Sequence, residues 1–168
     1  MSSRWQAHYP APPQWHSCRS GLPSWVASPP SGSCRRGALT FDHHAHLRHD
    51  ILPALDLPDP GTDANRMDVV IEWMLAVLSN QIRTSAPWMD KPIALTLRGG
   101  IGGGVWTVRP SGSIVRGGDE HAEVIVEATA IEFPEWGGTT RVSWRERDVS
   151  IIGDQDYASR FLDQLNVV

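Results

Sequence analysis

The sequence predicts an α+β protein, because the spacing of its apolar residues changes along the chain from a helical to a strand period. In the first half, apolar residues recur three and four positions apart over a long segment that reaches about Arg83. In the second half, Ile93, Leu95 and Leu97 occupy every other position, as in a strand with one buried face. The change follows Ser85-Ala86-Pro87, which predicts a domain boundary near residues 86–91.

Residues 1–37 have no apolar period of either kind and are dominated by Ser, Pro, Trp, Arg, Gly and Cys. Such a segment cannot bury enough apolar surface to offset the conformational entropy lost on ordering. Two interpretations follow. Residues 1–37 are a disordered extension, or they are an out-of-frame stretch of GC-rich DNA that has replaced the authentic sequence, in which case any ligand supplied from upstream is missing.

Two helices are predicted in residues 38–87. The first starts at Ala38 and ends or kinks near Pro53, because proline lacks an amide donor and clashes with the preceding turn. A turn at residues 57–61 follows, and Thr62 or Asp63 caps the second helix. The second helix carries a wide apolar stripe, formed by Met67, Val70, Ile71, Met74, Leu75, Val77, Leu78 and Ile82. A stripe of this width needs a packing partner, for which the first helix is the nearest candidate.

Residues 88–168 are predicted to form a small domain of mixed strands and helices, with a core of its own from about Pro92 onward. The run Gly99–Gly104 reverses the chain in a hairpin, and because a strand rather than a helix follows, it is not a phosphate-binding loop. Further strands are expected at residues 105–108, 122–127, 141–144 and 149–152. Thr129 and Glu132 have capping-box spacing for a short helix over residues 130–136, which Pro134 limits. A last amphipathic helix, with Tyr157 and Phe161, begins near Asp154 or Asp156.

Composition excludes several classes of function. The formal net charge of −4 leaves no basic surplus for binding nucleic acid. No apolar stretch is long enough to span a membrane, and no signal peptide is recognisable, so we expect a cytoplasmic protein without a membrane partner. Cys18 and Cys34 form no CxxC pair, which makes a thiolate zinc site improbable. The tryptophans in or beside predicted elements are expected to serve packing: Trp73, Trp106, Trp136 and Trp144.

Histidines cluster on the first helix, where His43, His44, His46 and His49 fall within seven residues. Residues three or four apart share a helical face, so His46 is spaced to bind one ion together with Asp42, His49 or Asp50. Imidazole and carboxylate ligands suit zinc or another divalent first-row metal. His43 and His44 point elsewhere on the helix and are expected to be solvated. The alternative is a polar helical face that binds no ion. One helix supplies two or three ligands, so the remaining ligands of a complete site must come from another element.

These segments resemble a known family. The sequence from Asp42 to Ile51, the following Ala54-Leu55-Asp56-Leu57-Pro58 and the long helix are similar to the end of the metal-binding bundle of mycothiol-dependent maleylpyruvate isomerases, in the DinB-like superfamily. The second half is similar to the sterol-carrier-like (SCP2-like) C-terminal domain of those proteins, in the segments 95–99 and 103–108 and in Gly153-Asp154 before the last helix. The resemblance covers roughly residues 38–168 and implies a two-helix remnant of a helical bundle followed by an SCP2-like domain.

The resemblance further implies a divalent metal, most simply zinc, and mycothiol as cofactors, with a small-molecule thiol and a small organic acid as partners. In that family, an acidic residue and a histidine four positions apart bind the metal with a histidine from an earlier helix; Asp42 and His46 match the pair. The chain departs from the family pattern at Leu52 and Pro53, and His8 and His16 lie in no predicted helix.

Three functions from different classes are therefore expected as alternatives. The first is a mycothiol-dependent isomerase or thiol transferase, inactive if the bundle is truncated, in which the metal lowers the pKa of the cofactor thiol. The second is a non-catalytic module that binds a partner or shields a small apolar ligand. The third is a metal-binding protein without turnover. The segment from about Pro92 to Val168 contains no recognisable catalytic residues.

Overall fold

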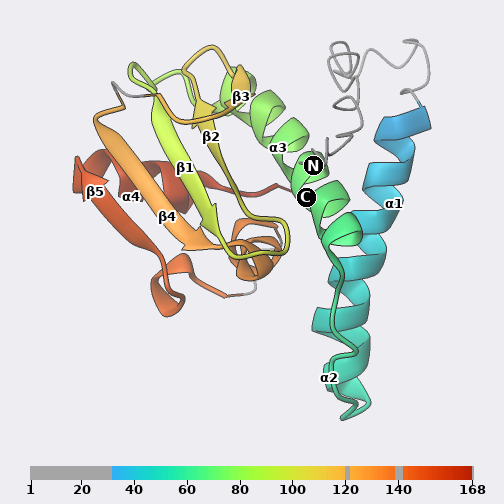
Figure 1. Ribbon diagram of the computed structural model, residues 1–168. Helices are drawn as coiled ribbons and strands as arrows, with labels where there is room; N and C mark the ends of the chain where they lie inside the picture. The colour runs from blue at the N-terminus through green and yellow to red at the C-terminus, as the bar shows by residue number, and fades with distance from the viewer. Residues whose placement is uncertain (1–31, 120–121, 139–141, 168) are drawn as a thin grey trace, which may run out of the picture.

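The computed structural model describes residues 32–119, 122–138 and 142–167. Two helical segments are followed by a five-stranded sheet and a C-terminal helix, which is the α+β class that the sequence predicts (Figure 1). The predictions for residues 1–31 lie outside the described residues. Among the described residues, no helix is both long enough and apolar enough to cross a bilayer.

The first helical segment is longer than the sequence predicts, because α1 spans Gly32–His46 and not a segment from Ala38. Gly37, within the added turns, lies against the second helix: a Cβ built on it would be 3.5 Å from Cβ of Trp73, an ordinary van der Waals distance. A π-helical turn, η2 (Leu47–Ile51), and a final turn, α2 (Leu52–Ala54), continue the segment. The helix therefore ends beside Pro53, as predicted.

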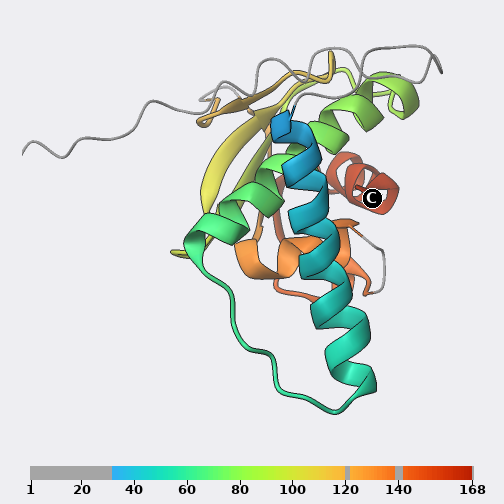
Figure 2. The ribbon, with the colours of Figure 1, turned by 90° about the vertical axis from the view of Figure 1, so that its right-hand side faces the viewer.

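The second helix, α3, spans Ala64–Ser85, and the Asp63 carboxylate accepts a hydrogen bond from Arg66 N, so Asp63 is the cap. Its apolar stripe is buried at Met67, Val70, Ile71, Met74, Leu75, Leu78 and Ile82. α1 packs beside α3 through buried Phe41 and Ala45, and the end of this first segment, with α2, extends beyond the sheet as an arm (Figures 1 and 2).

The sheet is mixed, with strand order β3-β2-β1-β4-β5. The strands are β1 (Ile93–Arg98), β2 (Gly104–Val108), β3 (Ile114–Arg116), β4 (Val124–Thr129) and β5 (Ser150–Gly153). β1 and β2 form the predicted antiparallel hairpin, whereas β1 and β4 are parallel, with Leu95 opposite Val126. The short strand β3 was not predicted, because three residues are too few to show a period.

One face of the sheet is covered by helices. Ile93, Leu95 and Leu97 of β1 are fully buried and belong to the same core as residues of α3 and of α4 (Gln155–Gln164) (Figure 2). Asp154 caps α4 by accepting a hydrogen bond from Tyr157 N. The predicted boundary at 86–91 therefore separates elements that share one core.

Two local predictions are wrong. Residues 130–136 do not form one capped helix: η3 (Ala130–Glu132) is a 3₁₀ turn without a side-chain cap, and a π turn, η4 (Pro134–Gly138), follows, since Pro134 cannot continue the hydrogen-bond pattern. Residues 142–144 are not a strand, because η5 (Trp144–Glu146) is a 3₁₀ turn that Ser143 caps, while residue 141 lies outside the described residues.

Candidate functional site

The predicted metal-binding residues lie on the exposed side of the helical arm. Nε2 of His46 lies 3.3 Å from Oδ1 of Asp42, and Nδ1 of His46 lies 2.6 Å from Oδ2 of Asp50. All three side chains are well exposed, at 57% for His46, 67% for Asp42 and 43% for Asp50. The structure thus brings together three of the four predicted residues, one turn apart along a single helical segment.

His49 and His44 have different surroundings. The charge of His49 contributes to a lowered pKa of Glu135, although the hydrogen bond that Arg147 donates to that carboxylate, at 2.8 Å, is the main cause. Burial lowers the pKa of His44 to about 4, and the nearby cations Arg48 and His49 act in the same direction. The exposed position that the sequence predicts for His44 is therefore wrong, because this side chain is half-buried.

A complete metal site does not form from these residues. Within residues 32–119, 122–138 and 142–167, no three His, Cys, Asp or Glu side chains are arranged to hold one ion. Both ring nitrogens of His46 face carboxylates, and a nitrogen that donates a proton to a carboxylate has no lone pair for a metal. The described residues therefore fit weak, exposed coordination at most, not the closed shell of a structural or catalytic zinc.

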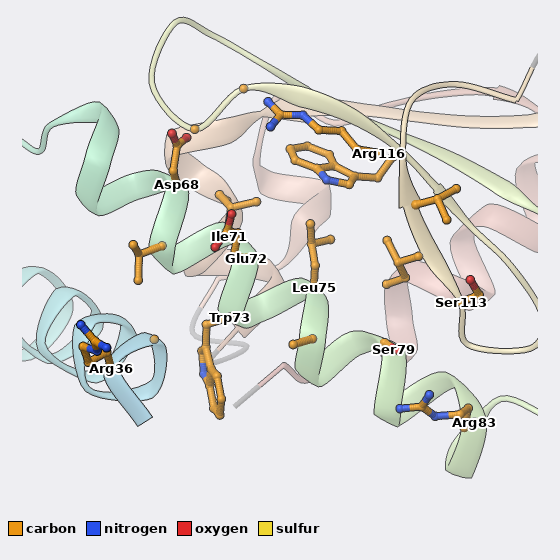
Figure 3. Close-up of a pocket in the computed structure, with 18 of the residues that line it drawn as sticks. Arg36, Asp68, Ile71, Glu72, Trp73, Leu75, Ser79, Arg83, Ser113 and Arg116 are labelled. Carbon is orange, nitrogen blue, oxygen red and sulfur yellow. The ribbon is translucent and has the colours of Figure 1, made fainter. Parts of the chain in front are cut away.

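A large hollow of the described structure lies elsewhere, in a cleft between α3 and the β2–β3 hairpin (Figure 3). Its volume is about 860 Å³. Ligand sites for small molecules measure about 300–1,000 Å³. The walls are mainly apolar and aromatic, and are formed by Val69, Ile71, Trp73, Leu75, Ala76, Trp106, Ile114 and Val115. A cleft of this size and lining can enclose a molecule with an apolar body.

One face of α3 supplies half of the polar side chains that line the cleft, and Arg36 of α1 lines it as well. Asp68, Glu72, Ser79 and Arg83 follow one another along this face, opposite Arg116 and Ser113 of the hairpin (Figure 3). These positions are separated by four, seven and four residues, that is by about one or two helical turns, so they form a second stripe beside the apolar stripe of the same helix. Sequence reasoning missed this site, and the second stripe is the signal that could have found it.

Charges at the start of α3 compensate one another. Partial burial in the cleft wall raises the pKa of Glu72, and the neighbouring Asp68 carboxylate acts in the same direction. Arg116 opposes both effects. The Arg116 guanidinium also lies 5.9 Å from the centre of the Trp106 ring, at the outer limit of a cation–π contact. This end of the cleft thus contains both signs of charge.

Tryptophan packing follows the prediction. Trp106 and Trp136 are buried, at 8% and 3% exposed, and Trp73 and Trp144 pack against the same core while partly exposed. Trp73 and Trp106 also line the cleft. Two aromatic rings are therefore available to a ligand as well as to the core.

No protein-family model and no curated protein matches the chain. Among solved structures, the sterol carrier protein 2 like 2 of Aedes aegypti aligns with 59% of this chain and 97% of its own chain. The sequence identity is 16% and the TM-score is 0.44. A similarity at this level establishes neither a family nor a function, so the α+β class rests on the helices and strands of the chain itself.

Proposed function

We propose that the protein is a non-catalytic binding module that takes up a small, largely apolar molecule in the cleft between α3 and the β2–β3 hairpin. The observation that carries the proposal is the cleft itself, with its volume of about 860 Å³ and its mainly apolar walls. Burial of apolar ligand surface against Ile71, Leu75 and Trp106 provides the driving force, at about 25 cal/mol per Å² removed from water.

The walls of the cleft belong to rigid elements, which favours a pre-formed site. Trp106 lies in β2, and Ile71 and Leu75 belong to the buried stripe of α3. Ser79 Oγ donates a hydrogen bond of 2.6 Å to Gly112 O, which ties the helix to the hairpin. A site whose walls are already in place loses little conformational entropy when a ligand binds.

A filling substitution tests this function. Ala76 lines the cleft, so Ala76→Phe should occupy ligand space and weaken binding of the neutral apolar fluorophore N-phenyl-1-naphthylamine at least tenfold. Ala64→Phe is the matched control, because Ala64 is an exposed residue at the start of the same helix, outside the cleft. The emission of the probe measures the dissociation constant. Absence of binding to the wild type, or equal weakening by both variants, would refute the proposal.

The isomerase activity that the resemblance implies stays a prediction. This activity needs a metal ion with about three protein ligands. The described residues around His46 do not form such a set. We therefore assign no catalytic step to His46 or to its neighbours. Mycothiol as cofactor and a metal-binding role without turnover likewise stay predictions.

A further inference from the structure

At the end of the cleft beside the C-terminus of α3, polar side chains form the wall. A turn over residues 109–113 closes this end, with a hydrogen bond of 2.8 Å from Gly112 N to Arg109 O and one of 3.0 Å from Arg109 N to Ser113 O. Arg83, in the last turn of α3, lies on the side of Ser113 (Figure 3). Ser111 and Ser113 line the cleft beside it.

The turn packs closely against the stem of Arg83. A Cβ built on Gly112 would lie 2.4 Å from Cγ of Arg83 and 2.5 Å from the carbonyl oxygen of Ser79, so only a glycine allows this contact. The hydrogen bond from Ser79 Oγ to Gly112 O fixes the same approach. The stem of Arg83 thus packs against the turn at Cγ, while the residue stays exposed, so that its guanidinium is accessible to a ligand.

Arg83 has no ionic partner in the part of the chain that the structure describes. The two carboxylates of the cleft, Asp68 and Glu72, lie toward the other end of α3, where Arg116 compensates Glu72. The cleft therefore has an apolar middle, a charge-compensated end and an uncompensated cationic end. Hydroxyl groups of Ser111 and Ser113 add hydrogen-bond donors beside the cation.

We infer that the molecule bound in the cleft is an organic acid whose carboxylate lies against Arg83 and the hydroxyls of Ser111 and Ser113, while its apolar body covers Ile71 and Leu75. This inference rests on the proposed function and adds the chemical class of the ligand. A guanidinium presents several N–H donors in a plane that matches a carboxylate, which makes arginine the suitable cation for this role.

A matched pair of probes tests the inference. 2-Naphthoate and 2-naphthamide have the same apolar body and differ in the charge of one group. Calorimetric titration at neutral pH should show that the wild type binds the naphthoate about fivefold more tightly than the amide, the ratio expected for a solvent-accessible ion pair worth about 1 kcal/mol. Arg83→Gln should reduce this ratio to about one and leave the affinity for the amide unchanged.

Arg109→Gln is the charge-matched control. Arg109 belongs to the same turn and is exposed, but it does not line the cleft, so its loss removes the same charge from the same end of the molecule. The ratio should stay near fivefold in this variant. Equal binding of both probes by the wild type, or equal loss of the ratio in both variants, would overturn the inference and leave the proposed function intact. If neither probe bound the wild type, the proposed function and the inference would both fail.

Discussion

The Nδ1 atom of His46 lies 2.6 Å from Oδ2 of Asp50, one turn farther along the same helical segment. On the other side of the ring, Oδ1 of Asp42 lies 3.3 Å from Nε2. A neutral imidazole has one N–H donor and can serve one of these carboxylates, whereas the doubly protonated ring can serve both. A metal ion must therefore displace one of these carboxylate contacts to reach a lone pair of the His46 ring.

We predict weak zinc binding centred on His46. Asp42 is the expected companion ligand, with Asp50 or His49 as alternatives, and water completes the shell. His46→Ala should abolish the calorimetric signal with zinc, because it removes the imidazole that lies between the Asp42 and Asp50 carboxylates. Affinity should decrease as the pH falls toward about 6, since histidine must lose its proton to bind.

His43→Ala is the control for the zinc titration, because His43 is an exposed histidine on the same helix. We expect this variant to bind zinc nearly as well as the wild type. Equal losses in the two variants, or no heat signal from the wild type, would contradict a site at His46.

A second prediction concerns the pH dependence of stability. Burial lowers the pKa of His44 from 6.5 to about 4, so between these pH values the unfolded chain binds a proton that the folded chain does not. The free energy of unfolding should therefore fall as the pH decreases from about 6.5 to about 4. His44→Gln should remove this contribution, which we expect to be about 1–2 kcal/mol after allowance for the partial exposure of the ring.

Urea unfolding at several pH values between 7 and 4.5 measures this difference in slope between the wild type and His44→Gln. His43→Gln removes the adjacent, exposed histidine and should keep the slope of the wild type. If both variants had the slope of the wild type, His44 would not be the residue that responds to pH.

The elements that the sequence predicts best are those with long, regular periods. The apolar stripe of α3 and the strand at β1 follow from local spacing, and the structure contains both elements. Residues 142–144 fail as a strand for a reason outside local spacing: the Trp144 indole donates a hydrogen bond of 2.8 Å to Oδ1 of Asp163 in α4. Trp144 and Asp163 are 19 residues apart in the sequence, so the spacing of residues around Trp144 could not indicate this contact.

The candidate site was harder to predict than the fold. The cluster around His46 stands out in the sequence because its histidines are close together. Their spacing does not show that both ring nitrogens of His46 contact carboxylates. The cleft, in contrast, is formed by α3 and the β2–β3 hairpin, which meet only in the folded chain. Glu72 and Arg116 are ordinary surface residues by sequence, and their electrostatic interaction depends on this packing.

A third prediction concerns the domain boundary near residues 86–91. A fragment of residues 88–168 lacks α3 and with it seven buried apolar side chains of the common core. Each such side chain stabilises the fold by about 1.5–3 kcal/mol, so their sum, about 10–21 kcal/mol, is as large as the whole stability of a typical domain, about 5–15 kcal/mol. We expect this fragment to lack a dispersed amide spectrum, whereas residues 62–168 should give one. A dispersed spectrum from residues 88–168 would instead support the independent domain predicted from the sequence.

The last prediction separates backbone strain from steric contact in the turn that closes the cleft. Gly112 and Gly61 have the same positive φ of 77°, but a Cβ on Gly61 would meet nothing within 4 Å, whereas one on Gly112 would meet Arg83 and Ser79. Gly61→Ala should therefore lower the free energy of unfolding by only about 1–2 kcal/mol, the usual penalty of this conformation for a residue with a Cβ. Gly112→Ala should lower the free energy of unfolding by at least about 1 kcal/mol more than Gly61→Ala does, because overpacking adds a cost of about 1–3 kcal/mol. Urea unfolding at neutral pH measures both values. Equal losses would mean that the turn can move away from α3, in which case it would not pack closely against the stem of Arg83.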